Sequence, residues 1–202
     1  MADRNRRRFP PLRLPPMRSR DGFTLVEALS VVFLIGILIA LAAPNIDVVQ
    51  YRMNGAVTEV GSTLLAAQRL AVTRQHDVVV RFDEPGRRII VHWDANNDGV
   101  QDADERVQTY PLAEGVVFGR GGAPPRPLGE GPIGFRADGD GLPTVRFHRN
   151  GSASEAGVLY LTSERAERSG DRPRDARALE LERSTGRPSW YRYSGTAWER
   201  AF

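Results

Sequence analysis

The chain has 202 residues, no cysteine, and 28 basic against 25 acidic side chains, a net charge of +3. This length provides for one domain with its own hydrophobic core, and the missing cysteines exclude a fold held together by disulfides. Residues 1–22 alone carry a net charge of +5, which leaves −2 for residues 23–202, so the overall charge is no evidence for a basic nucleic-acid-binding domain.

Residues 23–43 form the first predicted element, a helix that is apolar throughout except for Glu27 and small or weakly polar side chains. At about 1.5 Å per residue it would extend roughly 31 Å, the thickness of the hydrocarbon core of a bilayer. The arginine-rich leader before it is typical of a cytoplasmic flank. We therefore expect a single-pass membrane helix whose carboxyl end, with the rest of the chain, lies outside the cytoplasm. A carboxylate in such a helix is costly without a partner, which makes Glu27 a candidate functional residue.

The start of this helix resembles a known processing site. Its residues are Gly22, Phe23, Thr24, Leu25, Val26 and Glu27. Between a basic leader and an apolar run, this stretch is similar to the cleavage site of type IV prepilins and type II secretion pseudopilins. The resemblance implies that a prepilin peptidase cleaves between Gly22 and Phe23, and that the new amino terminus at Phe23 is N-methylated. It also implies that Glu27 pairs with the amino terminus of a neighbouring subunit in a filament.

Two other interpretations of the amino-terminal region remain. A secretory signal would be cleaved after the small residues 40–42 and would release a soluble domain that starts near Pro44. A twin-arginine signal would use residues 6–9, although prolines separate these from any apolar stretch. Neither interpretation accounts for Glu27, so the position of cleavage distinguishes them from the prepilin interpretation.

Residues 44–76 are expected to continue the helix as an amphipathic segment. Pro44 would kink the helix or begin a new segment. Beyond it, apolar and small residues recur every three or four positions, which places them on one face of a helix that ends near Gln75. These positions are Ile46, Val49, Met53, Val57, Val60, Leu64, Ala67 and Ala71. Gly55 and Gly61 weaken this helix by up to about 1 kcal/mol each relative to alanine.

Residues 77–202 are expected to form a β-rich head. Residues 78–82 and 89–93, joined by a turn at 83–86, are typical of a β-hairpin. Further short strands are expected at residues 106–110, 116–118, 133–135, 144–148, 158–162, 178–182 and 190–193. Residues 119–132 are a loop by composition, and residues 163–177, with charges of both signs, are expected to be a solvated excursion. The predicted fold class is α+β, with a long amino-terminal helix before antiparallel sheets.

The order of features in the head extends the resemblance. The features are Trp93 after the hairpin, an acidic Asp-Asn-Gly loop, a Phe-containing strand before Asn150 and Gly151, and a late Thr185-Gly186-Arg187. This order is similar to that of the H-type minor pseudopilins and the related T-type minor pilins. The resemblance implies a pilin-like head of two antiparallel sheets and a structural subunit, not an enzyme. Its partners would be the prepilin peptidase, the inner membrane and other pseudopilins or pilins in a periplasmic filament of the type II secretion system.

Residues 94–105 satisfy the pattern of a calcium-binding EF-hand loop. The candidate ligands are Asp94, Asn96, Asp98, the carbonyl of Val100, Asp102 and Glu105. However, an EF-hand loop joins two helices, whereas strands are expected on both sides of this one. Asn, Asp and Gly also favour the turns of an ordinary acidic hairpin loop. The sequence leaves both interpretations open, so calcium is the one candidate cofactor.

The remaining sequence contains no convincing catalytic motif. Residues 129, 131 and 134 spell GxGxxG, but Pro132 interrupts the pattern and no strand-to-helix context surrounds it. His76, His92 and His148 are far apart and lack the spacing of metal ligands.

A nucleic-acid interface is the alternative function. Aromatic residues near the carboxyl terminus alternate with Arg183, Arg187 and Arg192, a pattern that suits stacking on a strand and neutralising its charge. Some T-type minor pilins use a basic carboxyl-terminal segment to take up DNA, so the resemblance would then imply a type IV pilus minor pilin. Pro188 and nearby acidic residues depart from that pattern. The other interpretation is a terminal strand whose aromatic side chains pack into the sheet.

Overall fold

The structure is a computed structural model that describes residues 22–42 and 48–201. The chain divides into an amino-terminal unit, Met1–Ile46, and a head, Asp47–Phe202. In the first unit, α1 (Leu25–Ala42) is the predicted apolar helix. Within the described residues, no helix combines the length and the hydropathy needed to cross a membrane. The expected kink at Pro44 and most of the leader lie outside the described residues.

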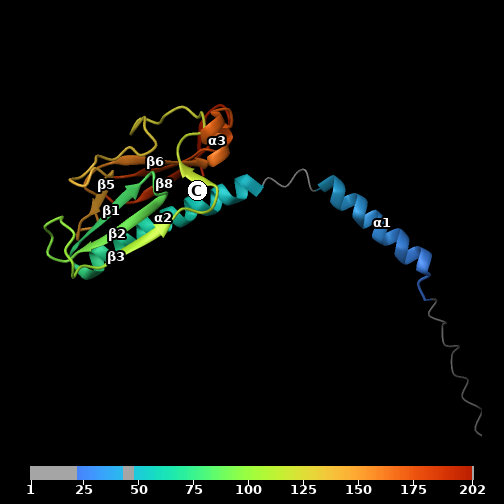
Figure 1. The fold of residues 1–202 in the computed structure, drawn as a ribbon, viewed down its shortest axis with the longest axis horizontal. Helices are drawn as coiled ribbons and strands as arrows, with labels where there is room; N and C mark the ends of the chain where they lie inside the picture. The colour runs from blue at the N-terminus through green and yellow to red at the C-terminus, as the bar shows by residue number, and fades with distance from the viewer. Residues whose placement is uncertain (1–21, 43–47, 202) are drawn as a thin grey trace, which may run out of the picture. The chain divides into compact units, whose positions relative to one another are not determined.

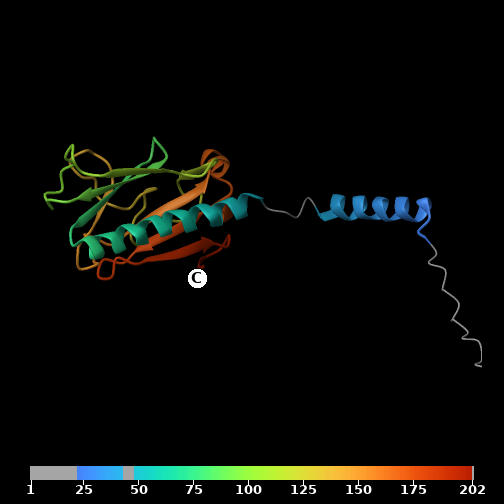
Figure 2. The ribbon, with the colours of Figure 1, turned by 90° about the horizontal axis from the view of Figure 1, so that it is seen from below.

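The head begins with the amphipathic helix α2 (Val48–Arg74), which lies along the sheets of the head (Figure 2). The predicted stripe is confirmed at six positions that are buried: Met53, Val57, Val60, Leu64, Ala67 and Ala71. Val49 is an exception, because it lies at the exposed start of the helix. Ile46 lies outside the described residues. The helical period of the apolar side chains therefore decides which face of α2 meets the sheets.

Two antiparallel sheets form the rest of the head (Figure 1), as predicted. The first has the order β3-β2-β1-β5, and the second the order β4-β6-β7-β8-β9. The first sheet consists of β1 (Asp77–Asp83), β2 (Arg88–Asp94), β3 (Val107–Pro111) and β5 (Thr144–Phe147). The second consists of β4 (Val116–Phe118), β6 (Gly157–Ser163), β7 (Arg177–Leu181), β8 (Pro188–Tyr193) and β9 (Trp198–Arg200). The predicted hairpin forms from β1 and β2, and Asp83 faces Arg88 next to its turn.

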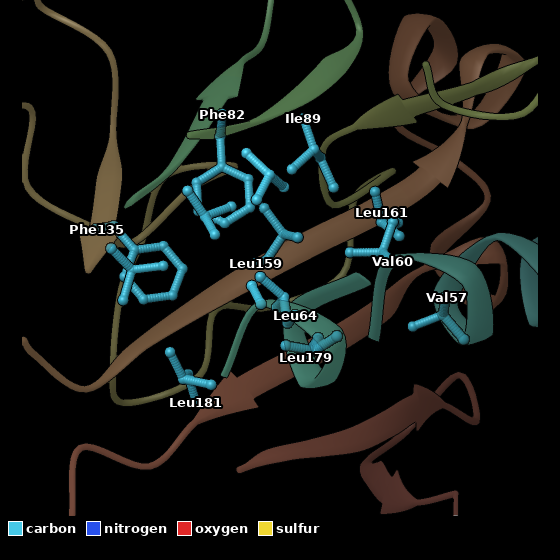
Figure 3. Close-up of a cluster of buried hydrophobic side chains, with 14 of the residues drawn as sticks. Val57, Val60, Leu64, Phe82, Ile89, Phe135, Leu159, Leu161, Leu179 and Leu181 are labelled. Carbon is cyan, nitrogen blue, oxygen red and sulfur yellow. The ribbon is translucent and has the colours of Figure 1, made fainter. Parts of the chain in front are cut away.

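Side chains from α2 and both sheets meet in one hydrophobic core (Figure 3). Leu64 comes from α2, Phe82 from the first sheet and Leu159 from the second, and all three are fully buried. The rings of Phe82 and Phe135 stack with their centroids 5.3 Å apart. This core fixes α2 to the sheets and makes the head one packing unit.

The prediction for residues 163–177 is confirmed only in part. Residues 165, 167–172 and 174 are exposed, as expected of a solvated excursion. The segment also contains the short helix α3 (Glu164–Ser169) and a 3₁₀ turn (Pro173–Asp175), which were not expected. The hydroxyl of Ser163 accepts a hydrogen bond from the backbone N–H of Ala166 and caps α3. Ala166 and Arg177 are buried. The high content of charged residues in this segment gave no indication of these buried contacts.

Two strand predictions also differ from the structure. Residues 133–135 form only an isolated bridge, between Ile133 and Leu159, and no strand. The short edge strand β9 was not expected, because its three residues are too few to show an alternating pattern.

Candidate functional site

The processing motif lies at the beginning of α1. The hydroxyl of Thr24 accepts a hydrogen bond of 3.2 Å from the backbone N–H of Glu27, so Thr24 acts as the helix N-cap. Phe23, just before the cap, has 83% of its surface exposed. Glu27 is also exposed, and it forms no ion pair with any residue that the structure describes. The motif is therefore accessible, and among the described residues the Glu27 carboxylate has no charged partner.

The rest of α1 exposes large apolar side chains on all sides. Those with more than half of their surface exposed, beyond the motif, are Leu29, Val32, Phe33, Leu34, Leu38 and Ile39. Monomeric soluble proteins rarely expose so large a contiguous apolar surface. The geometry of α1 is that of a helix whose surface is covered by lipid or by other subunits.

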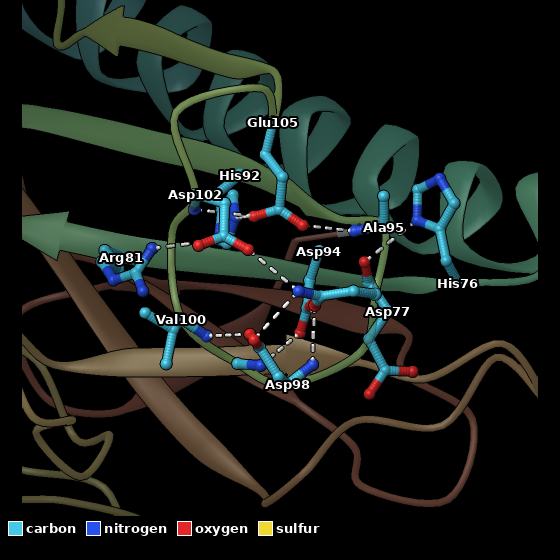
Figure 4. Close-up of polar contacts among 12 residues, drawn as sticks. His76, Asp77, Arg81, His92, Asp94, Ala95, Asp98, Val100, Asp102 and Glu105 are labelled. Carbon is cyan, nitrogen blue, oxygen red and sulfur yellow. Dashed lines mark hydrogen bonds and ion pairs between the residues drawn. The ribbon is translucent and has the colours of Figure 1, made fainter.

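The acidic loop after β2 is a turn in which side chains and backbone amides bond to one another (Figure 4). The carboxylate of Asp94 accepts hydrogen bonds from the backbone N–H of Asp98 at 3.0 Å and of Gly99 at 2.8 Å. The side-chain amide of Asn96 donates to the carboxylates of Asp98 and Asp102, at 2.9 Å each. Gly99 has a φ of +81°, the left-handed conformation that glycine adopts at little cost. The structure thus brings four of the six predicted ligands together.

Glu105, the sixth candidate ligand, turns its carboxylate toward His92 and the backbone of Ala95 (Figure 4). It contacts Nε2 of His92, and it accepts hydrogen bonds from the backbone N–H of Ala95 at 2.7 Å and of Asp102 at 3.1 Å. Burial raises the pKa of this carboxyl group, but the hydrogen bonds from His92 and the two amides outweigh burial and lower the pKa to about 2. Its oxygen atoms therefore face hydrogen-bond donors.

The calcium site stays a prediction. Among the described residues, no three acidic, histidine or cysteine side chains are grouped so that they could hold a metal ion. The loop joins β2 to β3, strands where an EF-hand has helices. Calorimetric titration of the protein and of Asp98→Ala with calcium tests the site. A binding curve that the substitution abolishes would establish it, and two flat traces would leave the acidic hairpin.

Sequence reasoning missed the polar network under this loop. His92 is fully buried, with Nδ1 3.3 Å from Nη1 of Arg81 and its other ring nitrogen against Glu105. Nδ1 of His148 lies 2.9 Å from the carboxylate of Asp77. The period of two in β2 would have indicated which way His92 points, but its partners lie 11 and 13 residues away along the chain. The contact between Glu105 and His92 fastens the loop to the first sheet.

The arginines of the nucleic-acid alternative do not form a stacking surface with the aromatic residues. Arg183 and Arg187 lie in the turn between β7 and β8, and Arg192 pairs with Glu199 at 3.1 Å. Nε1 of Trp190 donates to the carbonyl of Val57 on α2, at 3.1 Å. Trp198 packs against Tyr160 and Tyr193. The aromatic side chains thus contribute to packing, as the other interpretation of this segment predicted.

Comparisons with known proteins agree on two segments of the chain. Residues 17–43 match the prokaryotic N-terminal methylation motif, and residues 56–182 match the family of type II transport protein GspH. Among solved structures, the minor pseudopilin EpsH of the Vibrio cholerae type 2 secretion system is similar, with 15% identity and a TM-score of 0.44. That similarity covers 74% of this chain and 96% of the other. No curated protein sequence matches the chain.

Proposed function

The chain belongs to the GspH family of type II transport proteins, and it carries the prokaryotic N-terminal methylation motif. We propose that it is a minor pseudopilin and that a prepilin peptidase cleaves it between Gly22 and Phe23. The new amino terminus at Phe23 is then N-methylated. Members of this family are structural subunits, and their role is carried out through assembly with other pseudopilins. The nucleic-acid alternative is not favoured.

One observation supports this proposal most directly, the exposed apolar surface of α1 with Glu27 as its acidic residue. Before assembly, the helix anchors the subunit in the inner membrane with its head in the periplasm, the location that family membership suggests. In the filament, the same surface packs against the helices of neighbouring subunits. The anchor and the filament core thus use one apolar surface in succession.

Glu27 has a specific task in this scheme. A carboxylate among apolar side chains costs free energy unless a positive charge lies beside it. Cleavage creates such a charge at Phe23 of every subunit. We place the amino terminus of one subunit against Glu27 of its neighbour, which neutralises both charges and fixes the axial position of the two subunits.

The amino terminus of the mature protein tests the proposal. Mass spectrometry of protein isolated from cells with and without prepilin peptidase should show a peptidase-dependent start at Phe23 carrying a methyl group. A start near Pro44 in both strains would instead mean an ordinary secretory signal, and the proposed filament role would have to be abandoned.

A further inference from the structure

A proline-rich segment, residues 123–128, lies against the second sheet. Its sequence is Ala-Pro-Pro-Arg-Pro-Leu. A proline fixes its own φ at about −65°, and it pushes the residue before it towards extended or polyproline II conformations. Ala123, Pro124 and Arg126 each precede a proline. The sequence therefore favours a short polyproline II helix that ends at Pro127.

The burial of the segment follows the period of such a helix. Because a polyproline II helix has about three residues per turn, Ala123 and Arg126 share one edge of it. Ala123 is buried and Arg126 is half-buried, whereas Pro124, Pro125 and Pro127 are exposed. One edge of the helix thus lies on the sheet, and the other two edges present proline rings to solvent.

Contacts with the sheet hold the segment in this conformation. The hydroxyl of Tyr160 accepts a hydrogen bond of 2.6 Å from the backbone N–H of Arg126. Nε1 of Trp198 donates to the carbonyl of Pro124 at 3.0 Å. Cζ of Arg126 lies 3.6 Å from the centroid of the Tyr191 ring. These contacts use backbone groups and the arginine side chain, so they fix the segment and leave the proline rings exposed.

The exposed rings and one adjacent charge define what could bind here. The proline ridge, as we name it, consists of Pro124, Pro125, Pro127 and Leu128, of which Leu128 is 40% exposed. Glu130 follows the ridge, is exposed, and forms no ion pair with any residue in the described part of the chain. Proteins recognise polyproline II segments with grooves lined by aromatic side chains. A cation at the end of such a groove would complement Glu130.

We propose that the proline ridge is the docking surface for a partner protein with a groove lined by tyrosine or tryptophan. A lysine or arginine at the end of that groove meets Glu130. The segment is already ordered by its contacts with the sheet, so docking costs little conformational entropy. This inference goes beyond the proposed function and does not depend on cleavage before Phe23.

Photo-cross-linking in living cells tests the proposal. The photoreactive amino acid p-benzoylphenylalanine replaces Gly131, which is exposed just beyond the ridge, or Gly139, an exposed control position. A Cβ at Gly131 would meet only the carbonyl oxygen of Ile133, at 3.8 Å, and a Cβ at Gly139 meets nothing within 4 Å. Neither replacement should therefore disturb the fold. We expect a cross-linked partner at position 131 alone, attached beside an aromatic groove that mass spectrometry identifies.

Matched variants test the rings and the charge separately. Pro124→Ala with Pro127→Ala removes two rings of the ridge and should lower the yield of the cross-link about tenfold, a usual effect of truncating central interface residues. Pro85→Ala with Pro111→Ala removes two exposed rings elsewhere and should leave the yield unchanged. Glu130→Gln keeps the ridge intact and should lower the yield only about threefold.

Each outcome decides one point. The same yield from the ridge variant as from the control pair would overturn the role of the proline rings. A cross-link to a second copy of this chain, or to a surface without aromatic side chains, would overturn the proposed partner. Absence of any cross-link at position 131 would overturn the docking proposal as a whole. None of these results bears on cleavage before Phe23, which is measured at the amino terminus itself.

Discussion

At the scale of single residues, the buried contact between His92 and Glu105 makes stability depend on pH. Folding lowers the pKa of Glu105 from 4.5 to about 2. The carboxylate therefore stabilises the fold fully above about pH 4.5, and this contribution disappears as the pH falls towards 2. At about pH 6 we expect Glu105→Gln to lower the free energy of unfolding by up to about 3 kcal/mol, and the difference from the unmodified protein should shrink below pH 4.5. Urea unfolding over a series of pH values measures both quantities.

A matched control for this variant lies on the surface. Glu182 also has a lowered pKa, caused by hydrogen bonds from Ser184 and Thr185, but it is exposed at the edge of a turn. Glu182→Gln should therefore change stability little at any pH, because solvent screens exposed charges. If the effect of Glu105→Gln stayed constant from about pH 6 to pH 3, the contact with His92 would not be the source of the stabilisation.

Arg177 is the second residue with a large expected effect. It is 1% exposed, and its guanidinium donates to Asn54 at 3.0 Å and to Gln50 at 2.5 Å, both on α2. Arg177→Met should lower the free energy of unfolding by about 3 kcal/mol, because the buried carbonyl of Ala176 and the side chains of Gln50 and Asn54 all lose the guanidinium as their donor. Arg192→Met removes an arginine from an exposed ion pair and should cost less than about 1 kcal/mol. Similar denaturation midpoints for the two variants would show that Arg177 does not fasten α2 to the second sheet.

At the scale of elements, two glycines in α2 distinguish helix propensity from packing. A Cβ atom at Gly61 would lie 2.3 Å from Cζ2 of Trp190, whereas a Cβ at Gly55 meets nothing within 4 Å. Gly55→Ala should stabilise the protein by about 0.5–1 kcal/mol, since alanine favours a helix. Gly61→Ala should destabilise it by about 1–3 kcal/mol, because the tryptophan ring must move. Thermal unfolding of both variants measures the difference, and stabilisation by Gly61→Ala would mean that α2 and β8 are not in close contact.

The sequence was sufficient for elements whose pattern is local. The stripe of α2 and the hairpin at residues 83–86 depend on neighbours a few positions apart, and both were predicted correctly. The helix α3 and the burial of the nearby Arg177 were not predicted. In sequence, a buried arginine cannot be distinguished from a solvated one, and the partners of Arg177, Gln50 and Asn54, are far away along the chain. The same limit applies to Glu105, which fits a calcium pattern in sequence but contacts His92 in the fold.

At the scale of the whole molecule, the head and α1 differ in whether their apolar side chains are buried. The head buries its own apolar side chains in one large core and two smaller clusters, so it satisfies the ordinary requirements of a globular domain. α1 leaves its apolar side chains exposed, and this exposure has to be relieved by lipid or by other subunits. The amino-terminal motif was recognisable from sequence because it is a short linear stretch, whereas a surface for another subunit is made of residues that lie far apart in the chain.

Glu27 provides the decisive test of assembly, because its proposed role requires the amino terminus of another subunit, either a second copy of this chain or a related protein. Glu27→Gln keeps the length of the side chain and suits the N-cap at Thr24, but it removes the charge. We expect normal cleavage before Phe23, normal head stability and loss of most filament incorporation. Thr24→Ala is the control, since it weakens the cap by about 1 kcal/mol and leaves the charge in place, so incorporation should largely persist. Cross-linking of filaments from cells that produce each variant measures incorporation, and normal levels for Glu27→Gln would refute the charge pairing while leaving the family assignment intact.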